Sequence, residues 1–332
     1  MALAPLAADE QLALTGAWVN DPRGRAATGI PAIDGLLDRG GLAPGDFVVF
    51  GGKSRTRKTT TVLNLIKNFL EQEVPVGLVG LDETKPRYVL KLMSAMTGDT
   101  VKDIQEAWDA PDGEMLRERY AYLASRLSLS DGFEPTKADL EAWLNQAEVA
   151  TGHRPQVVVL DYLALLAKGK YDGNENSRIP KLTRELQIFC SEQEVVTIAL
   201  HQVGRFDEGS SGRYHGHTPM SLESLKHGGE EYADIVLGSY RPALDPLGHM
   251  SFDDAMAYLP DSWKDETREK RWSEATARVK KYRNSTFIQL LKNRPGVDTL
   301  EEGTELVSEG KSMLMRPAGK LNDLDMLRVG EG

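Results

Sequence analysis

The stretch FVVFGGKSRTRKTTTVLNLIKNFL, residues 47–70, decides the fold. Its first four residues are apolar and run into the pair Gly51-Gly52, as a buried strand does where it enters a glycine turn. A strand, a polar loop and an amphipathic helix in this order predict the phosphate-binding loop of a P-loop nucleotide-binding protein. The helix is predicted from apolar residues that recur at helical spacing: Val62, Leu63, Leu65, Ile66, Phe69 and Leu70.

The loop of this stretch, GKSRTRKT, begins at Gly52 and carries nearly all the groups that a bound polyphosphate needs. In the usual pattern G-x-x-x-x-G-K-[ST], backbone N–H groups and the lysine contact phosphates, and the hydroxyl binds Mg²⁺. Lys58 and Thr59 take these two places, and Thr60 follows them. Arg57 replaces the second glycine, so the loop either accepts backbone strain or follows a variant path. We predict nucleotide binding, with a decayed loop kept as a scaffold as the alternative.

A second element of the same chemistry is the apolar run Val157–Leu160, which ends at Asp161. A carboxylate in this position suits the Mg²⁺-associated aspartate of a P-loop ATPase. The motif is weak alone, because many buried strands end in aspartate. It is strengthened by its place about a hundred residues after the phosphate loop and before the strand-like run Val195–Leu200. Asp161 is therefore the candidate metal-supporting carboxylate.

Apolar runs with strand character alternate with helical patterns along the chain. Residues 101–150 look helical throughout, and another helical stripe ends at Cys190. This alternation predicts an α/β fold in which helices cover both faces of a predominantly parallel central sheet. The predicted strands are Phe47–Phe50, Val76–Leu81, Val157–Leu160, Val195–Leu200, Ile235–Leu237 and Phe287–Leu291.

The same patterns divide the chain into one large domain and two ends. Residues 28–316 are predicted to form the domain, residues 1–27 an N-terminal arm or linker, and residues 317–332 a flexible C-terminal tail. The acidic, glycine-containing stretch EEGTELVSEGK, residues 301–311, is expected to be a hairpin turn.

Residues 242–284 interrupt the alternation and are predicted to form a helical insertion. Between Lys264 and Arg283 the segment has eight Lys or Arg against four Asp or Glu, and it carries Trp272. The favoured interpretation is a solvated helix packed through Trp272, and the alternative is a contact with nucleic acid or with another subunit.

Composition restricts the class of protein. The net charge of −10 argues against a protein that coats nucleic acid with its whole surface. A local basic channel is compatible with this charge, because salt limits the reach of a surface charge to about 10 Å. The single cysteine, Cys190, excludes an internal disulfide framework and a multi-cysteine zinc site. No run of 18 apolar residues and no basic-then-apolar start occurs, so we expect a cytoplasmic protein that does not enter a membrane.

With these motifs in place, the chain over residues 28–315 resembles the motor domain of DnaB-type replicative helicases, the ring helicases of the RecA-like superfamily. The opening segment is shared with RadA- and KaiC-like ATPases, and the later segments are more specific. From this resemblance we expect a phage- or plasmid-like form without the N-terminal domain. The segments that carry the resemblance, in the family's order, are TGIPAIDGLLDRGGLAPGDFVVF, VGLVGLDETKPRYVLKLM, VVVLDYLALL, TIALHQVGR, PMSLESLKHGGEEYADIVLGSYR and FIQLLKNRPG.

The resemblance implies catalytic roles for residues outside the phosphate loop, with ATP and Mg²⁺ as cofactors. Asp82 stands where the family has a glutamate that orients the attacking water, and its shorter side chain leaves neighbouring Glu83 as an alternative. Gln202 matches the γ-phosphate sensor that passes the signal to the DNA loops. Lys292 and Arg294 match the late K-x-R pair, which reaches into the neighbouring subunit's site as an arginine finger.

The resemblance also implies partners: single-stranded DNA, a homo-oligomer in the form of a hexameric ring, a primase or loader, and 5′-to-3′ movement. Lys226, His227 and Gly229 fall in the family's strand-holding loop, in a looser match. Arg205 and Arg213, in a Gly/Ser-rich stretch, are further candidates for contact with DNA.

Two other functions stay open at this point. One is a RadA- or KaiC-like ATPase of recombination or regulation, against which the LDYLALL and KNRPG segments count. The other is a nucleotide-binding P-loop protein with impaired hydrolysis that acts as a structural or loading partner, which Arg57 and Asp82 favour.

Overall fold

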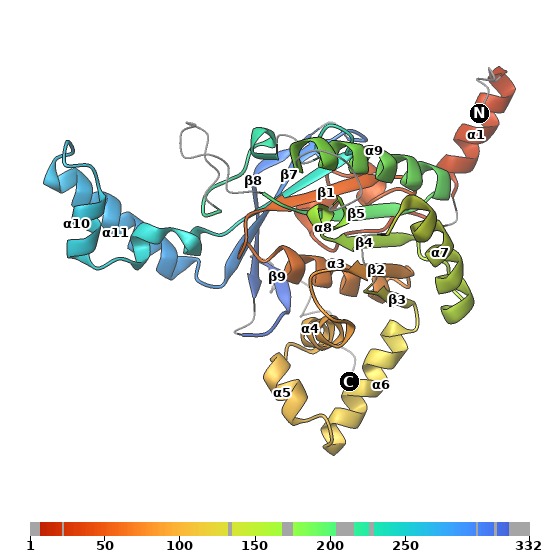
Figure 1. Ribbon diagram of the computed structural model, residues 1–332, viewed down its shortest axis with the longest axis horizontal. Coiled ribbons are helices and arrows are strands. Elements are labelled where there is room, and N and C mark those ends of the chain that lie inside the picture. The colour runs from red at the N-terminus through yellow and green to blue at the C-terminus, as the bar shows by residue number, and fades with distance from the viewer. Residues whose placement is uncertain are drawn as a thin grey trace, which may run out of the picture.

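The computed structural model describes residues 7–21, 23–131, 135–167, 175–203, 216–225, 229–296, 298–308 and 311–318. In this part of the chain a nine-stranded sheet has the order β3-β2-β4-β5-β1-β6-β7-β8-β9 (Figure 1). The strands are β1 (Phe47–Gly52), β2 (Val76–Gly80), β3 (Leu127–Ser130), β4 (Val157–Asp161), β5 (Val196–Gln202), β6 (Ile235–Tyr240), β7 (Ser285–Asn293), β8 (Leu300–Ser308) and β9 (Met315–Pro317).

The first six strands of the sheet order are parallel, which confirms the predicted α/β class. Every residue of β1, β2, β4 and β6 is buried, as expected for parallel strands covered on both faces. The register places Gly52 beside Gln202 of β5 and Ser239 of β6, and Gly80 beside Asp161. The carboxyl ends of these strands therefore meet along one edge of the sheet, hereafter the carboxyl edge.

Strands β7, β8 and β9 are antiparallel and extend the sheet beyond β6. Because β7 runs back along β6, Phe287 near its start pairs with Tyr240, and its last residue, Asn293, pairs with Ile235. The prediction of a hairpin turn over residues 301–311 was wrong, since most of this stretch belongs to β8. Backbone pairing of β8 to β7 and β9 outweighs its weak strand propensity.

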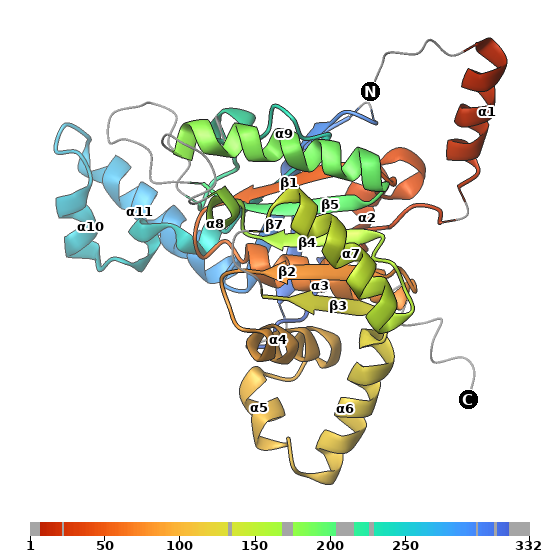
Figure 2. The same ribbon diagram turned by 45° about the vertical axis from the view of Figure 1, so that its right-hand side comes forward.

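Helices cover both faces of the sheet (Figure 2). The core on one face includes residues of α3 (Lys58–Glu71) and α4 (Lys85–Thr97), and α5 (Val101–Glu106) and α6 (Pro111–Ala124) lie beyond α4. The core on the other face includes residues of α7 (Lys137–Thr151), α8 (Leu163–Ala167) and α9 (Glu175–Gln193), with Cys190 fully buried. The expectation that residues 101–150 are helical throughout was wrong at one place, because β3 lies between α6 and α7 and pairs with β2.

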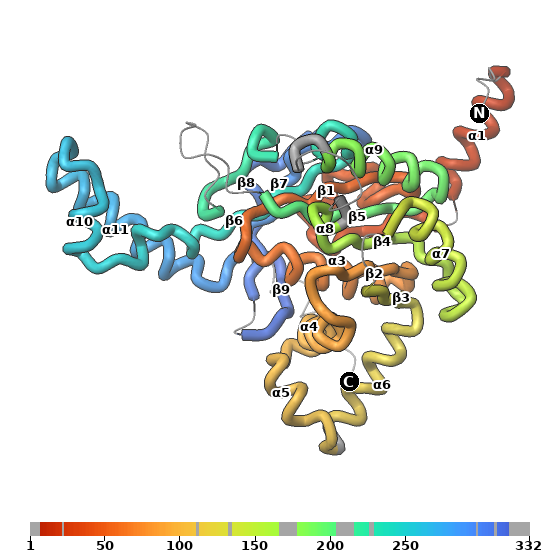
Figure 3. The backbone as a smooth tube through the Cα atoms, viewed as in Figure 1, coloured from red at the N-terminus to blue at the C-terminus, as the bar shows by residue number. Residues whose placement is uncertain are grey.

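The segment between β6 and β7 projects from the body as a helical hairpin (Figure 3). It contains the short helices η3 (Pro242–Leu244) and η4 (Pro246–His249), followed by α10 (Phe252–Tyr258) and α11 (Asp265–Lys281). A small core of its own joins Leu247, Ala255, Leu259 and Ala275, and Trp272 packs against it. The hairpin therefore holds its shape through internal packing, while its two ends are fixed by the sheet.

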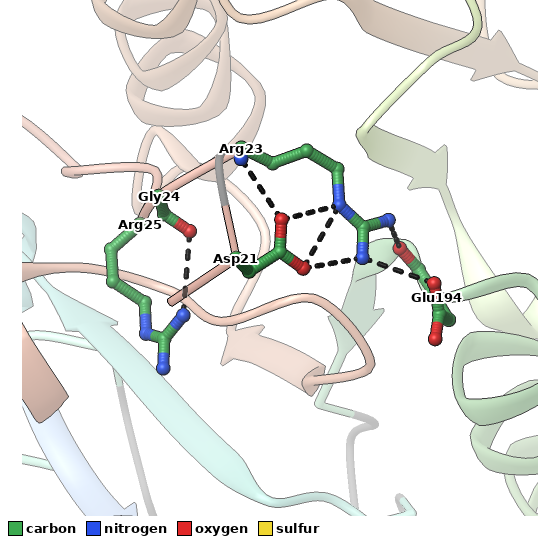
Figure 4. A network of polar contacts seen from close by, with 5 residues as sticks. All are labelled: Asp21, Arg23, Gly24, Arg25 and Glu194. Atoms are coloured by element: carbon green, nitrogen blue, oxygen red, sulfur yellow. Dashed lines mark hydrogen bonds and ion pairs between the residues drawn. The ribbon is translucent and has the colours of Figure 1, made fainter. Parts of the chain in front are cut away.

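The N-terminal stretch contains α1 (Ala8–Val19), α2 (Pro31–Asp34) and η1 (Asp38–Gly40), and Arg23 joins it to the body (Figure 4). The Arg23 guanidinium forms an ion pair with Asp21 at 2.6 Å and donates to the Glu194 carbonyl at 3.0 Å, just before β5. The hydrogen bond to Arg23 also lowers the pKa of Asp21. Across the described residues, every helix falls short of the length and apolar character that a bilayer span requires.

Candidate functional site

A cavity of about 420 Å³ opens at the carboxyl edge of the sheet. It lies where the phosphate loop between β1 and α3 meets the ends of β4 and β5, the segment after β2 and the segment after β6. Seven of the predicted site residues are therefore brought together in one place. The residues that line it are Ser54, Arg55, Arg57, Lys58, Thr59, Thr60, Asp82, Asp161, Tyr162, Gln202, Arg241 and Leu244.

The phosphate loop places Lys58 at the start of α3, with its ammonium turned into the loop. Lys58 Nζ donates to the Gly52 carbonyl at 2.7 Å and to the Lys53 carbonyl at 2.9 Å. Burial lowers the pKa of Lys58 to about 8, and the charges of Asp161 and Asp82 act in the opposite direction. The ammonium thus contacts neutral carbonyls and lies near two carboxylates in a buried position. This arrangement suits a group that binds a polyphosphate.

The backbone at Gly52 lies too close to its neighbours for a side chain. A Cβ there would come within 2.3 Å of Ser239 Oγ and 2.7 Å of Thr56 Oγ1. These two hydroxyls are hydrogen-bonded to each other at 2.8 Å, which ties the loop to β6. The glycine therefore lets the loop form a narrow cradle directly above the sheet.

Arg57 accepts the backbone strain that the sequence left as one of two possibilities. It is the N-cap residue of α3 with φ 64° and ψ 31°, the left-handed conformation that the missing glycine would take. Its Nη1 donates to the Asn284 carbonyl at 2.9 Å and to Ser308 Oγ at 2.5 Å. Burial lowers the pKa of this half-buried guanidinium. Arg57 thus takes a left-handed backbone conformation, and its side chain is anchored to the sheet beyond β6.

Asp161, at the end of β4, forms the acidic side of the cavity. Its Oδ2 accepts from Thr59 Oγ1 at 3.3 Å and from Tyr88 OH at 3.0 Å. Burial raises the pKa of Asp161 to about 6, against the hydrogen bonds from Tyr88 and Thr59 and the charge of Lys58. A buried carboxylate beside a threonine hydroxyl provides the hard oxygen donors that Mg²⁺ prefers.

Tyr88 is a site residue that the sequence reasoning missed. In the sequence it stands only within the segment VGLVGLDETKPRYVLKLM, yet its hydroxyl donates to Asp161 Oδ2 beyond the end of β2. Gly80 makes this possible, because a Cβ at that position would lie 2.2 Å from Tyr88 Cε2. The glycine that ends β2 was the only signal of such a close approach in the sequence.

Asp82 and Gln202 line the cavity from the ends of β2 and β5, the parallel strands on either side of β4. Asp82 follows β2, whereas the Glu83 carboxylate accepts a hydrogen bond from Lys91 and pairs with that residue. Of the two acidic candidates for water orientation, Asp82 is therefore the one that faces the cavity. Gln202 ends β5 directly beside Gly52. Burial lowers the pKa of the preceding residue, His201, to about 4, so that imidazole is neutral at pH 7.

Arg241 is a second residue that the sequence reasoning missed. It follows β6, and its guanidinium donates to the carbonyls of Arg55 and Arg283, both at 3.1 Å. Burial lowers the pKa of Arg241 to about 10, and the charge of Arg57 acts in the same direction. Its position directly after an apolar strand in a nucleotide-binding sheet was a usable signal. Arg57 and Arg241 together tie the phosphate loop to the C-terminal end of the hairpin.

Lys292 and Arg294 lie at the opposite edge of the sheet, hereafter the amino edge, and not in the cavity. They flank Asn293, which pairs with Ile235, the first residue of β6. Lys292 Nζ donates to the Glu230 carbonyl at 2.7 Å, and Arg294 forms an ion pair with Asp234 at 2.9 Å. Within one chain, this pair therefore has no access to the phosphate loop.

Most of the candidate DNA-binding residues, Arg205, Arg213, Lys226 and His227, lie outside the described residues. Gly229 is described and has φ 92°, and a Cβ there would lie 2.3 Å from Thr183 Cγ2 of α9. The glycine is thus required by a left-handed backbone packed closely against a helix. Thr60, the last predicted phosphate-loop residue, donates to Met313 Sδ at 3.7 Å as well as lining the cavity.

Comparison with known proteins gives a family match over most of the chain. The family described as the DnaB-like helicase C-terminal domain matches residues 26–292. The replicative DNA helicase DnaB of Helicobacter pylori strain J99 is 26% identical over 219 residues, which are 64% of this chain and 44% of that protein. The corresponding protein of Pasteurella multocida is 24% identical over 65% of this chain and 46% of its own length. The chain thus spans less than half the length of these curated relatives.

Solved structures show the same fold. The ATPase domain of G40P superposes with a TM-score of 0.66 at 19% identity and covers 94% of this chain and 100% of its own. A DnaB-like replicative helicase, solved to show its interactions with primase, has a TM-score of 0.62 at 20% identity and covers 92% of this chain and 65% of its own.

Proposed function

The chain belongs to the DnaB-like helicase C-terminal domain family, and from this premise we propose that it is an ATP-hydrolysing motor that moves along single-stranded DNA in replication. The observation that carries the proposal is the cluster of Lys58, Thr59 and Asp161 around one cavity at the carboxyl edge. Family membership disfavours the RadA- or KaiC-like alternative. The proposal assigns to this chain the activity of whole relatives, although the region that this chain shares with them is less than half of their length.

In this proposal the nucleotide is ATP and the metal is Mg²⁺. The backbone cradle at Gly52 and the Lys58 ammonium hold the phosphates. Thr59 supplies a hydroxyl ligand to the metal, and Asp161 orients that hydroxyl through the hydrogen bond between them. Bound Mg²⁺ would neutralise charge on the phosphates. Asp82 orients the attacking water, and Gln202, next to the phosphate loop, senses the γ-phosphate.

The proposed active site is shared between subunits of a hexameric ring. Lys292 and Arg294 flank Asn293, the last residue of β7, at the amino edge, which places them on the far side from their own cavity. If the amino edge of one subunit docks against the carboxyl edge of the next, Lys292 and Arg294 of the first subunit reach the cavity of the second as a finger. Arginine suits the role because its planar fork stabilises charge spread over a transferring phosphoryl group.

The proposed polynucleotide contacts come from Arg205, Arg213, Lys226, His227 and Gly229. The positive charges of Arg205, Arg213 and Lys226 make phosphate contacts dominant, so affinity should fall steeply as salt rises and should depend little on sequence. A primase or loader is the proposed protein partner, by analogy with the helicase whose solved structure shows interactions with primase.

One observation favours a second candidate, a nucleotide-binding partner with impaired hydrolysis. Arg57 holds the phosphate loop through a strained backbone, and Asp82 is shorter than the family's glutamate. ATP turnover with and without single-stranded DNA separates the two candidates. If the chain is a motor, DNA should stimulate its ATP turnover and it should unwind a forked duplex. Comparison of forks that carry a 5′ or a 3′ single-stranded tail gives the direction of movement. Binding of Mg·ATP without turnover in either condition would support the impaired form instead.

A further inference from the structure

A buried glutamine in β7 is not explained by the proposed chemistry. Gln289 is completely buried between the core residues Ile288 and Leu290. A primary amide in such a place is unfavourable unless its polar atoms are hydrogen-bonded. The amide has an oxygen acceptor and two N–H donors, so its partners reveal what it holds.

All the hydrogen-bonding groups of Gln289 are used. Its Oε1 accepts from the Met220 backbone N–H at 2.9 Å, and its Nε2 donates to the Met220 carbonyl at 3.0 Å. Nε2 also donates to the carbonyl of Glu301 in β8. One side chain thus binds both backbone groups of a single residue, as a neighbouring strand would. Met220 is 3% exposed, so these backbone groups depend on internal partners.

Met220 belongs to the described segment 216–225, which also borders the phosphate loop, because a Cβ at Gly216 would lie 3.3 Å from Lys53 Cβ and 3.5 Å from Thr56 Cγ2. The Gly216 carbonyl accepts from the backbone N–H of Arg241 at 2.8 Å. Side chains of Met220 and Leu225 lie directly over Gly51, where an added Cβ would approach them to 3.0 Å and 2.6 Å. Gly238 leaves room on the other side, because a Cβ there would lie 3.2 Å from Gln289 Oε1. Segment 216–225 is therefore packed against β1, β6 and β7, and its first residue lies beside the phosphate loop.

The position of this segment in the sequence gives the anchor its significance. Arg205 and Arg213 precede it, and Lys226, His227 and Gly229 follow it, so every candidate DNA contact is adjacent to one end or the other. Gln289 also lies in the strand that leads to Lys292 and Arg294. A displacement of the segment by bound DNA would act on the phosphate loop and on the candidate finger together.

We propose that Gln289 is a positioning residue that fixes segment 216–225 against β7 and so couples polynucleotide binding to nucleotide turnover. This inference rests on the proposed function. It requires the amide itself, because an apolar side chain of similar length fills the space but leaves the Met220 backbone without its two partners.

The test compares Gln289→Met with Thr286→Val. Both substitutions remove a buried polar group from β7, but the Thr286 hydroxyl has no hydrogen-bond partner among the described residues. ATP turnover is measured with and without saturating oligo(dT), together with the KM for ATP. Gln289→Met should lower the stimulation ratio by about fivefold or more, the low end of an allosteric coupling. The KM for ATP should change far less, and Thr286→Val should keep the wild-type ratio.

Amide hydrogen exchange of Met220 provides the second measurement. The amide should be protected in the wild-type protein and should exchange faster in Gln289→Met. An unprotected Met220 in the wild type, or an unchanged stimulation ratio in Gln289→Met, overturns the inference while the proposed motor function stands. A wild-type protein that DNA does not stimulate overturns both. If Gln289→Met does not fold, the exchange of the Met220 amide is measured in the wild type alone, with and without oligo(dT). The amide should be protected, and its exchange rate should change when oligo(dT) is added. An exchange rate that does not change overturns the inference.

Discussion

The two edges of the sheet hold their charged side chains in opposite ways. At the carboxyl edge, Lys58 and Asp161 are largely buried, and burial moves the pKa values of both toward neutrality, to about 8 and about 6. At the amino edge, the Arg294 side chain is 52% exposed and pairs with Asp234 on the surface. The first arrangement is unfavourable for folding and suits a ligand that brings compensating charge.

The second arrangement is easily undone. An exposed ion pair contributes only about 0–1 kcal/mol, so Arg294 can leave Asp234 for a stronger partner at small cost. The comparison indicates a division of labour in which one edge is a preformed receptor and the other carries a releasable group for a neighbouring molecule. The predictions below test each half of this division.

The largest effect is expected at the receptor edge. Lys58→Ala should abolish ATP turnover and weaken nucleotide binding by roughly 10- to 100-fold, because it removes charged hydrogen bonds of about 1.5–3 kcal/mol. The unfolding temperature at pH 7 should not fall, since burial disfavours the ammonium that is lost. Fluorescent-nucleotide titration and thermal unfolding measure both quantities. Lys67→Ala, on the same helix but paired with Glu71, is the control and should behave as wild type. Normal hydrolysis by Lys58→Ala would place the chemistry elsewhere.

The next effect is expected at the amino edge. Arg294→Ala should bind ATP almost normally and hydrolyse it about a thousandfold more slowly, the lower range for an arginine finger. Mixing it with Lys58→Ala protein should partly restore turnover, because some interfaces then pair an intact phosphate loop with an intact finger. Arg126→Ala, which removes another surface ion pair, is the control. Turnover that survives Arg294→Ala and is independent of protein concentration would show a site complete within one chain.

A third prediction separates stability from activity at Asp161. Asp161→Asn should lower Mg²⁺ affinity roughly 10- to 100-fold, as loss of a group that orients a metal ligand does. It should also raise the unfolding temperature of the nucleotide-free protein at pH 8. The folded pKa of about 6 exceeds the ordinary value of 3.8, so ionisation of the wild-type carboxyl destabilises the fold above pH 6. The gain should shrink between pH 6 and pH 4 and vanish below. A gain in unfolding temperature that is independent of pH would mean that ionisation of the Asp161 carboxyl is not its cause.

The same contrast explains what the sequence could and could not predict. Lys58, Thr59 and Asp161 could be proposed from the sequence because the pattern that suggests their chemistry is local, at the junction of a strand with the loop that follows it. Tyr88 and Arg241 were missed because their roles depend on which strands are neighbours and on the space left by Gly80, which are long-range properties. β8 was missed because its pairing with β7 outweighs a polar, glycine-containing sequence. The separation of Lys292 from the cavity follows only from the antiparallel direction of β7.

The smallest expected effect concerns Arg57, which tests whether the two edges have separate roles. The left-handed backbone costs about 1–2 kcal/mol for a residue other than glycine, and Arg57→Gly relieves it while losing the bonds to Asn284 and Ser308. These terms oppose each other, so the free energy of unfolding should change by no more than about 1 kcal/mol. Turnover should stay within a few fold of wild type or rise.

Arg57→Ala is the matched variant, because it loses the same hydrogen bonds but keeps the strained backbone. It should be less stable than Arg57→Gly by about 1 kcal/mol, measured by urea unfolding of both proteins. A different result would carry more weight than the expected one. If Arg57→Gly and Arg57→Ala both lose turnover as severely as Arg294→Ala, then the Arg57 guanidinium acts on the phosphates from within its own chain. The carboxyl edge would then supply an arginine of its own, in addition to the one that the amino edge of the neighbouring subunit supplies.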